Sequence, residues 1–289
     1  MGAKEQFLRA EGLERLPGLA GAAHLWASRE PRWLPKPPTC PNTGLKVYYP
    51  LDLASAMPIL ALIQAVGSAH AVLDTCAAPG GKFLVLAGFF QSSKLVAVEQ
   101  DAFRLSRLKQ NLRLYLPRGR DLPPTLAHLF SLCQSSSLVI QTSPRPHAPT
   151  VLRGDFTQLP LPHAFDAVLV DAPCSSDRER LLRAQRRGQA APWAARRAEA
   201  NAVRQRRLLA AALRATEGHV VYATCALSSI ENDLVVEQVL GGAALVSEPL
   251  EVEGLEVEKT RLGYQVLPDR PGNWGPLYWS TLRSGKRAS

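Results

Sequence analysis

The stretch FDAVLVDAPC, residues 165–174, is a short apolar run that ends in an acid, a proline and a cysteine. Runs without polar alternation are typical of strands that are buried on both faces of a parallel sheet. Four further runs read the same way: AVLDTC (71–76), KLVAVEQ (94–100), VLRGDF (151–156) and HVVYATC (219–225). Helices are predicted around them at 81–90, 101–116, 196–215 and 228–240. This alternation predicts a doubly wound, mostly parallel α/β sheet with right-handed crossovers.

Three regions depart from this alternation. Near the C-terminus, GYQVLP (263–268) and LYWSTL (277–282) flank a Pro/Gly turn, which predicts a closing antiparallel hairpin. Residues 1–50 hold many prolines and few periodic runs, so we expect an extension that wraps around one domain spanning 51–289. Residues 117–150 are rich in Pro and Ser, and only SSLVIQT there could form a strand. Because long structureless loops are uncommon inside compact domains, a surface insertion is predicted.

The composition narrows the class of partner. A formal net charge of +9 over 289 residues favours a polyanionic partner, with nucleic acid first. The alternative is an arginine-rich surface that is merely solvated. Five cysteines without a CxxC pair predict reduced thiols rather than a disulfide framework, and no metal site. No apolar run approaches the roughly 18 residues of a membrane helix, and neither a secretory signal nor a transit peptide is expected.

The first predicted strand leads into DTCAAPGGKFLVL, which contains the pair Gly80 and Gly81. Two glycines between a strand and a helix let the backbone approach a ligand and aim helix N–H groups at it. A plain tight turn is the alternative. Neither the dinucleotide fingerprint GxGxxG nor the phosphate-binding GxxxxGK[ST] is matched. A nicotinamide or ATP site therefore has no local support.

Acids follow at the ends of the next two strands. Glu99 ends the second strand, where an acid can accept hydrogen bonds from both ribose hydroxyls of a nucleoside. Asp155 ends the third strand and could contact an adenine amino group. Either acid alone is weak support, since strand ends often carry solvated acids. Together with the glycine pair they predict an adenosine-containing ligand across the carboxyl edge of the sheet.

Four motifs carry a resemblance to a known family: CAAPGGK (76–82), GD (154–155), DAPC (171–174) and TC (224–225). In this order, and over residues 43–285, the chain resembles the Nop/Sun family of RNA cytosine-C5 methyltransferases. DAPCSSDRE and PDRPGNWGPLYWSTL look most similar to the mitochondrial branch, which modifies ribosomal or transfer RNA. The resemblance implies a Rossmann-like fold, S-adenosyl-L-methionine as cofactor and an rRNA or tRNA substrate.

The same resemblance implies a mitochondrial location, with the nucleus or cytoplasm as alternatives, and a protein partner that helps to select the RNA. It also implies which residues bind the cofactor. These are the loop residues Cys76, Ala77, Ala78, Pro79, Gly80, Gly81 and Lys82, together with Glu99, Asp155 and Asp171.

The chemistry of cytosine explains why two cysteines would be needed. C5 of cytosine is a poor nucleophile until a thiolate adds to C6, after which C5 can attack the sulfonium methyl. By resemblance, Cys225 is the nucleophile, Cys174 assists product release, and Asp171 holds the base at N3/N4. DNA cytosine methyltransferases use the proline–cysteine thiol as nucleophile, so the reverse assignment of the two thiols stays open. DNA is a weaker candidate substrate, because the large target-recognition region of those enzymes is absent.

Several residues have a functional and a structural interpretation. A free thiol is only a few per cent ionised at neutral pH, so Cys225 needs help, and Lys82 is a candidate for it. Cys40 and Cys133 lie outside every motif and are expected to be small buried hydrophobes. Arg178 opens a run of arginines and could bind RNA phosphates, although the run also fits the solvated face of a helix.

Two classes of function follow. The first is an enzyme that makes 5-methylcytosine in RNA, and the second is a noncatalytic, cofactor-retaining RNA-binding or ribosome-assembly factor. Asp171, Cys174 and Cys225 together favour the enzyme, because a binding module needs none of them.

Overall fold

The structure is a computed structural model, and it describes residues 9–10, 13–15, 26–28, 36–91, 93–116, 140–141, 149–161, 164–189, 195–252, 254–270 and 274–285. The helices are α2 (Leu53–Val66), α3 (Gly81–Phe89), α4 (Ala102–Tyr115), the 3-10 helix η3 (Phe156–Gln158), α6 (Asp177–Arg186), α7 (Ala195–Ala215) and α8 (Asp233–Val239), which is followed by the short 3-10 helix η4 (Leu240–Gly242).

The strands up to the centre of the sheet are β1 (Leu13–Arg15), β2 (Trp26–Ser28), β3 (Ala71–Asp74), β4 (Lys94–Glu99), β5 (Ile140–Gln141), β6 (Thr150–Arg153) and β7 (Phe165–Asp171). They are followed by β8 (Thr216–Thr224), β9 (Ala243–Leu245), β10 (Glu258–Lys259), β11 (Tyr264–Val266) and β12 (Leu277–Ser284). β1 and β2 pair with each other in an antiparallel ladder.

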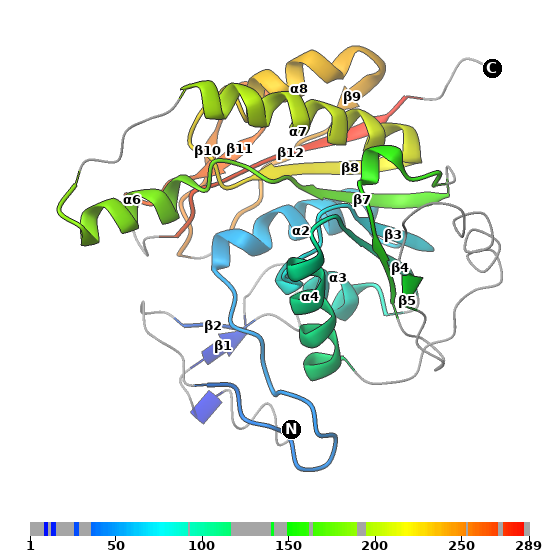
Figure 1. Cartoon of the computed structure of the whole chain (residues 1–289), viewed down its shortest axis with the longest axis vertical. Helices are drawn as coiled ribbons and strands as arrows, with labels where there is room; N and C mark the ends of the chain where they lie inside the picture. Colours follow the sequence, from blue (N-terminus) through cyan, green and yellow to red (C-terminus); the bar gives the residue numbers. More distant parts are fainter. Residues whose placement is uncertain are drawn as a thin grey trace.

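The main sheet has the strand order β10-β11-β12-β8-β7-β3-β4-β6-β5, with β9 paired to β12 (Figure 1). The five strands from β8 to β6 run parallel, as the unbroken apolar runs predict. β12 pairs antiparallel with β8, and β11 pairs antiparallel with β12. The predicted mostly parallel α/β sheet with a C-terminal antiparallel hairpin is therefore confirmed.

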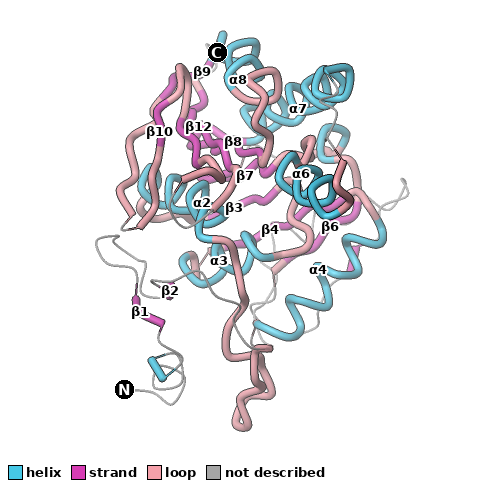
Figure 2. Tube along the Cα trace, turned by 90° about the vertical axis from the view of Figure 1, so that its left-hand side faces the viewer, coloured by secondary structure: helices cyan, strands magenta, loops and turns pink. Residues whose placement is uncertain are grey.

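Helices cover both faces of this sheet (Figures 1 and 2). On one face, α2, α3 and α4 bury a core that includes Met57, Phe83 and Leu108. On the other face, α7 and α8 bury a second core that includes Leu209 and Tyr222. Because both faces are covered, the carboxyl edge of the parallel strands is the edge at which loops can present polar side chains.

Helix α2 lies in a stretch for which the sequence predicted no element. Nine of its fourteen residues are buried, so it has no polar face and no helical alternation of apolar and polar residues. Pro58 within it further weakens the helical pattern. A helix that is apolar all round is one that is buried on every side, and its period cannot be read from sequence.

The helix predicted over 228–240 is shorter than expected, and this prediction was wrong in its first five residues. Residues 229–232 form a turn, with the N–H of Glu231 donating to the Ser228 carbonyl and that of Asn232 to the Ser229 carbonyl. Helix α8 begins only at Asp233. Apolar spacing alone did not show that the side chains of this turn are directed into the protein, where they make the contacts described below.

The predicted wrapping extension and insertion lie largely outside the described residues. Where the extension is described, Lys46 N–H donates to the Leu114 carbonyl at 2.8 Å, and the rings of Tyr49 and Tyr115 meet edge to face. Within 117–150, the described residues include β5, which pairs antiparallel with β6. The division into an extension over 1–50, a domain over 51–289 and an insertion over 117–150 stays a prediction. Among the described residues, none of the helices has both the length and the apolar character needed to cross a bilayer.

Candidate functional site

The glycine loop joins β3 to α3 and is shaped by its two glycines. Gly80 has φ +110°, a left-handed conformation that side chains rarely tolerate, and a Cβ there would lie 2.9 Å from Leu108 Cδ1. At Gly81 a Cβ would lie 2.9 Å from the Tyr49 ring and 3.0 Å from Leu51. The glycine pair was expected to allow close approach of a ligand. In the structure, the atoms that approach the two glycines closely are side-chain atoms of Leu108, Tyr49 and Leu51.

Helix α4 and strand β4 hold this loop in place. The N–H of Ala77 donates to the Val98 carbonyl at 2.9 Å. Arg104 donates to the Ala78 carbonyl at 2.6 Å, and Asn111 donates to the Pro79 carbonyl at 2.8 Å. The loop backbone is therefore fixed beside the end of β4, where Glu99 lies.

Glu99 is 4% exposed and lines a pocket at the carboxyl edge of the sheet. Its Oε1 accepts a hydrogen bond from Asp101 N–H at 2.9 Å. Its Oε2 has no hydrogen-bond partner among the described residues, although Arg104 approaches to 3.8 Å. Because an unpartnered buried carboxylate oxygen is costly, this atom suits a ligand that brings a hydroxyl donor. The other lining residues are Thr75, Cys76, Gln100, Arg104, Gly154, Asp155, Phe156, Pro173, Arg204 and Leu208.

Asp155 lies across the same pocket, at the end of β6. Its Oδ1 accepts hydrogen bonds from Thr157, at 3.0 Å from N–H and 2.9 Å from the hydroxyl. Asp155 thereby caps the 3-10 helix η3. One carboxylate oxygen is thus engaged within the protein, and the residue still faces the pocket that contains Glu99.

Asp74 is a buried acid that is not among the site residues predicted from the sequence. It is 1% exposed, its Oδ1 accepts from Cys76 N–H at 3.2 Å, and its Oδ2 has no partner in the part of the chain that the structure describes. Burial, and then the negative charge of Asp171, raise the pKa of Asp74 to about 8. The sequence signal was present, because Asp74 ends a buried apolar run in the way that Glu99 does.

The raised pKa of Asp74 predicts a pH-dependent stability. Above the ordinary value of 3.8 and below about 8, the folded chain binds a proton that the unfolded chain has released. The contribution of Asp74 is therefore complete below pH 3.8 and is lost as pH rises through about 8. Asn does not titrate, so only the wild type loses this contribution. We expect the Tm of Asp74→Asn minus the Tm of the wild type to rise by about 3 °C or more between pH 5 and pH 9. Thermal melts of both proteins across this range test it, and a constant difference would contradict it.

Lys82 connects the glycine loop to the end of β7. Its ammonium group lies 2.8 Å from Asp171 Oδ2, and both side chains are mostly buried. Burial lowers the pKa of Lys82, but the charge of Asp171 and the hydrogen bond outweigh it, so the pKa is raised overall. Lys82 is therefore a fixed cation that orients Asp171 at the edge of the sheet.

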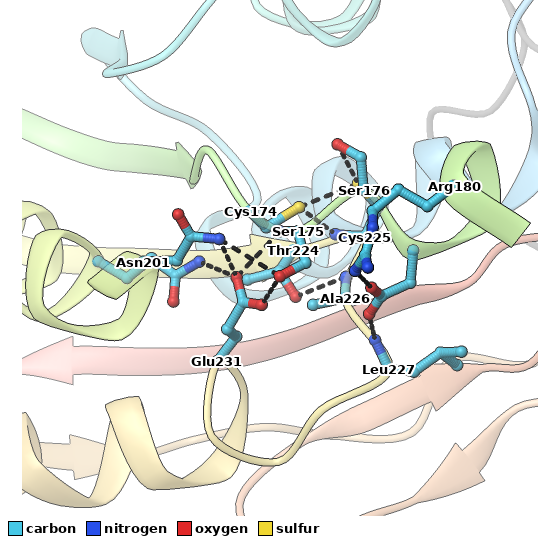
Figure 3. A network of polar contacts seen from close by, with 12 residues as sticks. Cys174, Ser175, Ser176, Arg180, Asn201, Thr224, Cys225, Ala226, Leu227 and Glu231 are labelled. Atoms are coloured by element: carbon cyan, nitrogen blue, oxygen red, sulfur yellow. Dashed lines mark hydrogen bonds and ion pairs between the residues drawn. The ribbon is translucent and has the colours of Figure 1, made fainter. Parts of the chain in front are cut away.

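Cys174 and Cys225 follow two neighbouring parallel strands, β7 and β8. Their sulfur atoms lie 3.0 Å apart, and the Cys225 N–H donates to Cys174 Sγ at 3.3 Å (Figure 3). Both residues are half-buried and reduced. The two thiols, which follow different strands in the sequence, therefore lie together at one edge of the sheet. Within the described residues, no group of three or more His, Cys, Asp or Glu side chains is arranged to hold a metal ion.

The thiols differ in acidity. A hydrogen bond from Cys174 lowers the pKa of Cys225 against the opposing effect of burial, and Ser176 and Lys82 add smaller contributions. The hydrogen bond to Cys225 and burial raise the pKa of Cys174 well above its ordinary value. Burial, and then Asp74, raise the pKa of Cys76 to about 12. Cys225 is therefore the thiol of these three that ionises most readily.

The arginine run lies on α6 and α7. Helix α6 begins three residues after Cys174, and it carries Arg178, whose side chain lies outside the described residues. On the same helix, Arg180 pairs with Asp177 at 3.3 Å and Arg183 pairs with Glu179. Further exposed arginines are Arg186, Arg187, Arg196, Arg197, Arg204 and Arg207.

Comparison with known proteins gives the family. The model of the family described as 16S rRNA methyltransferase RsmB/F matches residues 61–117 and 137–283. The mitochondrial tRNA (cytosine(34)-C(5))-methyltransferase of Danio rerio is 35% identical over 84% of this chain and 62% of its own length. The 5-cytosine rRNA methyltransferase NSUN4 of Xenopus tropicalis is 34% identical over 83% of this chain and 57% of its own. The chain thus spans about three fifths of these relatives.

A third relative and two solved structures extend the comparison. The mitochondrial tRNA (cytosine(34)-C(5))-methyltransferase of Mus musculus is 31% identical over 93% of this chain and 73% of its own length. A methyltransferase homologue from Pyrococcus horikoshii has a TM-score of 0.62 and 20% identity, covering 97% of this chain and 81% of its own. NSun6 from the same organism, solved with SFG, has a TM-score of 0.59 and 21% identity over 82% and 53%. These two show the same fold. On the family match and the relatives together, the chain belongs to the RsmB/F family of RNA methyltransferases, as its motifs predicted.

Proposed function

We propose that the chain is an S-adenosyl-L-methionine-dependent methyltransferase that makes 5-methylcytosine in RNA. The observation that carries this proposal is the pair of sulfur atoms 3.0 Å apart, next to the ion pair of Lys82 and Asp171. The family match and the names of the relatives support the reaction type. A module that only binds RNA has no need of one thiol with a lowered pKa beside another with a raised one.

The cofactor proposal is supported by the pocket at the edge of the sheet. The unpartnered Glu99 Oε2 would accept hydrogen bonds from ribose hydroxyls, as acids at this position do in this class of sheet. Asp155 would contact the base, and the loop over 76–82 and Asp171 would hold the amino-acid end. When bound, the cofactor supplies an activated methyl group. NSun6 from Pyrococcus horikoshii, which has this fold, was solved with SFG.

In the proposed mechanism each residue at the thiol pair has a distinct task. Cys225, the more acidic thiol, adds as thiolate to C6 of cytosine and so activates C5. Asp171, oriented by Lys82, hydrogen-bonds the base at N3/N4. In the final elimination C5 loses its proton, the bond between C6 and Cys225 breaks, and the aromatic ring is restored. Cys174 retains its own proton because its pKa is raised, and it lies close enough to Cys225 to donate a hydrogen bond to the departing thiolate. The reverse assignment of the thiols has less support, since Cys174 is the weaker acid.

The RNA interface is proposed on the helices next to the thiols. Helix α6 starts beside Cys174 and carries Arg178, Arg180 and Arg183, so phosphates of an RNA strand could be bound as the base enters. We further propose a mitochondrial protein that acts on rRNA or tRNA with the help of a protein partner. The location and the substrates rest on the printed names of the relatives. The partner rests on family resemblance alone.

Two measurements test the proposed function. Purified protein and radiolabelled cofactor are incubated with cellular RNA, and bisulfite sequencing compares RNA from cells with and without the protein. We expect methyl incorporation in vitro and the loss of at least one 5-methylcytosine in the cells. If the protein binds RNA and the cofactor yet leaves every cytosine unmethylated, the noncatalytic assembly factor is the better description.

Glu99→Gln tests the cofactor site. The amide replaces one acceptor oxygen with a donor, which leaves a ribose hydroxyl facing a donor inside a buried pocket. We expect the Kd for S-adenosyl-L-methionine to rise about tenfold or more, the effect of about 1.4 kcal/mol or more of lost hydrogen bonding. Calorimetric titration measures it. Glu237→Gln, at an exposed ion pair with Arg261, is the control, and equal affinities in all three proteins would contradict the assignment.

A further inference from the structure

Glu231 is a buried acid that the proposed mechanism does not use. It is fully buried, and its carboxyl group accepts four hydrogen bonds (Figure 3). Ser175 donates two of them, one from its backbone N–H at 3.0 Å and one from its side-chain hydroxyl. The others come from Asn201 at 3.0 Å and Gln205 at 2.9 Å, both on α7. Because Ser175 directly follows Cys174, Glu231 fastens the loop after β7 to helix α7.

Asn232, the next residue, fastens the other cysteine loop. Its side-chain oxygen accepts a hydrogen bond from the Thr224 hydroxyl at 2.6 Å. Its side-chain nitrogen donates to the Ala226 carbonyl at 3.0 Å. Thr224 and Ala226 flank Cys225 on either side. Two consecutive residues of one turn therefore hold the two thiol-bearing loops, one loop each.

The loop after β7 is held in a conformation that it would not adopt alone. Ser176 has φ +51°, a left-handed conformation that is uncommon for a residue with a side chain. Such a conformation persists when the surroundings over-determine it. On one side of Ser176, Ser175 is bound by Glu231, and on the other side Asp177 accepts from Leu227 N–H at 2.9 Å. Both cysteine loops are thus fixed by polar contacts as well as by strand pairing.

We propose that Glu231 and Asn232 are positioning residues, which set the separation of the Cys174 and Cys225 sulfur atoms and thereby keep Cys225 reactive. In the proposed methyl transfer, on which the catalytic part of this inference rests, the pair would act entirely through the two thiols. Neither residue lines the pocket that contains Glu99, so cofactor binding should not depend on them. One turn holds both cysteine loops, and the positions of the two loops set the distance between the sulfur atoms.

The test follows the acidity of Cys225. Glu231→Gln replaces one of the two acceptor oxygens with an amide donor, so at least one of the four donors faces another donor, and Asn232→Asp removes the donor to Ala226. In both variants the loops should loosen, and the hydrogen bond from Cys174 that lowers the pKa of Cys225 should weaken. The rate of Cys225 alkylation by iodoacetamide, followed by mass spectrometry across pH 6 to 10, reports this directly. We expect its midpoint to move up by about one pH unit, which slows alkylation about tenfold at neutral pH.

The groups that act on Cys225 from neighbouring elements are Cys174, Asp171, Ser176 and Lys82. None of them is altered in the two variants. Thr216→Val is the matched control, because the buried Thr216 hydroxyl donates to the Phe165 carbonyl at the opposite end of the same two strands. It should destabilise the fold without changing the alkylation profile. With RNA, the two variants should lose at least tenfold in kcat while the KM for the cofactor stays unchanged.

The outcomes separate the two proposals. Midpoints at the wild-type pH in both Glu231→Gln and Asn232→Asp would overturn the positioning role, and so would an equal shift in Thr216→Val. If either variant does not fold, the other decides. If the midpoints shift as expected but the wild type methylates no RNA, the positioning of the thiols stands and the proposed function fails.

Discussion

Cys225→Ala is expected to abolish methyl transfer, with a loss of at least about 10³-fold in rate, because it removes the thiol proposed to add to C6 of cytosine. Cys174 should substitute poorly, because burial, the second cause of its raised pKa, remains in this variant after the hydrogen bond to Cys225 is lost. Cofactor affinity should be unchanged, because Cys225 does not line the pocket that contains Glu99. Methyl incorporation into RNA and calorimetric titration of the cofactor measure the two quantities separately.

A matched control is available in Cys40→Ala, which removes a half-buried thiol that is neither in the lining of the pocket containing Glu99 nor in the Cys174–Cys225 pair. Its activity should equal that of the wild type. Retained activity in Cys225→Ala would contradict the assigned nucleophile. If Cys174→Ala were inactive and Cys225→Ala were active, the thiols would have the roles that they have in DNA cytosine methyltransferases.

The parallel strands could be predicted from sequence because burial on both faces of the sheet makes nearly every residue of these strands apolar. In β3 all four residues are buried, and in β7 the run Ala167–Val170 is fully buried. Each strand then ends at a polar residue that matters, such as Asp171 or Glu99. Local composition therefore predicts both the strand and the functional polar residue at its carboxyl end.

Other features depended on contacts between distant segments. Nine of the fourteen residues of helix α2 are buried by segments that are distant in the sequence, so its apolar run carries no helical period. Glu231 and Asn232 fall within the helix predicted over 228–240, because apolar spacing does not show which polar residues face inward. They turn inward because Ser175, Gln205 and Thr224 arrive from other elements to meet them.

The distance between the thiols was likewise beyond sequence reasoning. Adjacent strands in register, with Asp171 opposite Ala223, bring the two loops to one edge of the sheet. Strand spacing alone would allow a wide range of sulfur separations, because each cysteine sits past the end of its strand. The value of 3.0 Å and the resulting difference in acidity come from the loop contacts.

Cys174→Ala is expected to trap a covalent protein–RNA adduct, because the variant keeps the nucleophile and loses the thiol that assists its expulsion. The adduct should appear as a slowly migrating band on a denaturing gel, and RNase treatment should remove it. The double variant Cys174→Ala/Cys225→Ala is the control, and it should give no adduct. A single variant that turns over normally without any adduct would show that elimination does not need Cys174.

The pKa of Cys225 also predicts how adduct formation in Cys174→Ala depends on pH. The hydrogen bond from Cys174 is the largest cause of the lowered pKa of Cys225, so Cys174→Ala should raise that pKa while Lys82 and Ser176 still lower it. Addition to C6 then requires more alkaline solution. The initial rate of adduct formation should therefore increase between pH 7 and pH 9 in Cys174→Ala, while the wild type forms little adduct at either pH. A rate that is independent of pH would mean that Cys225 ionises without help from Cys174, and that Cys174 acts at elimination alone.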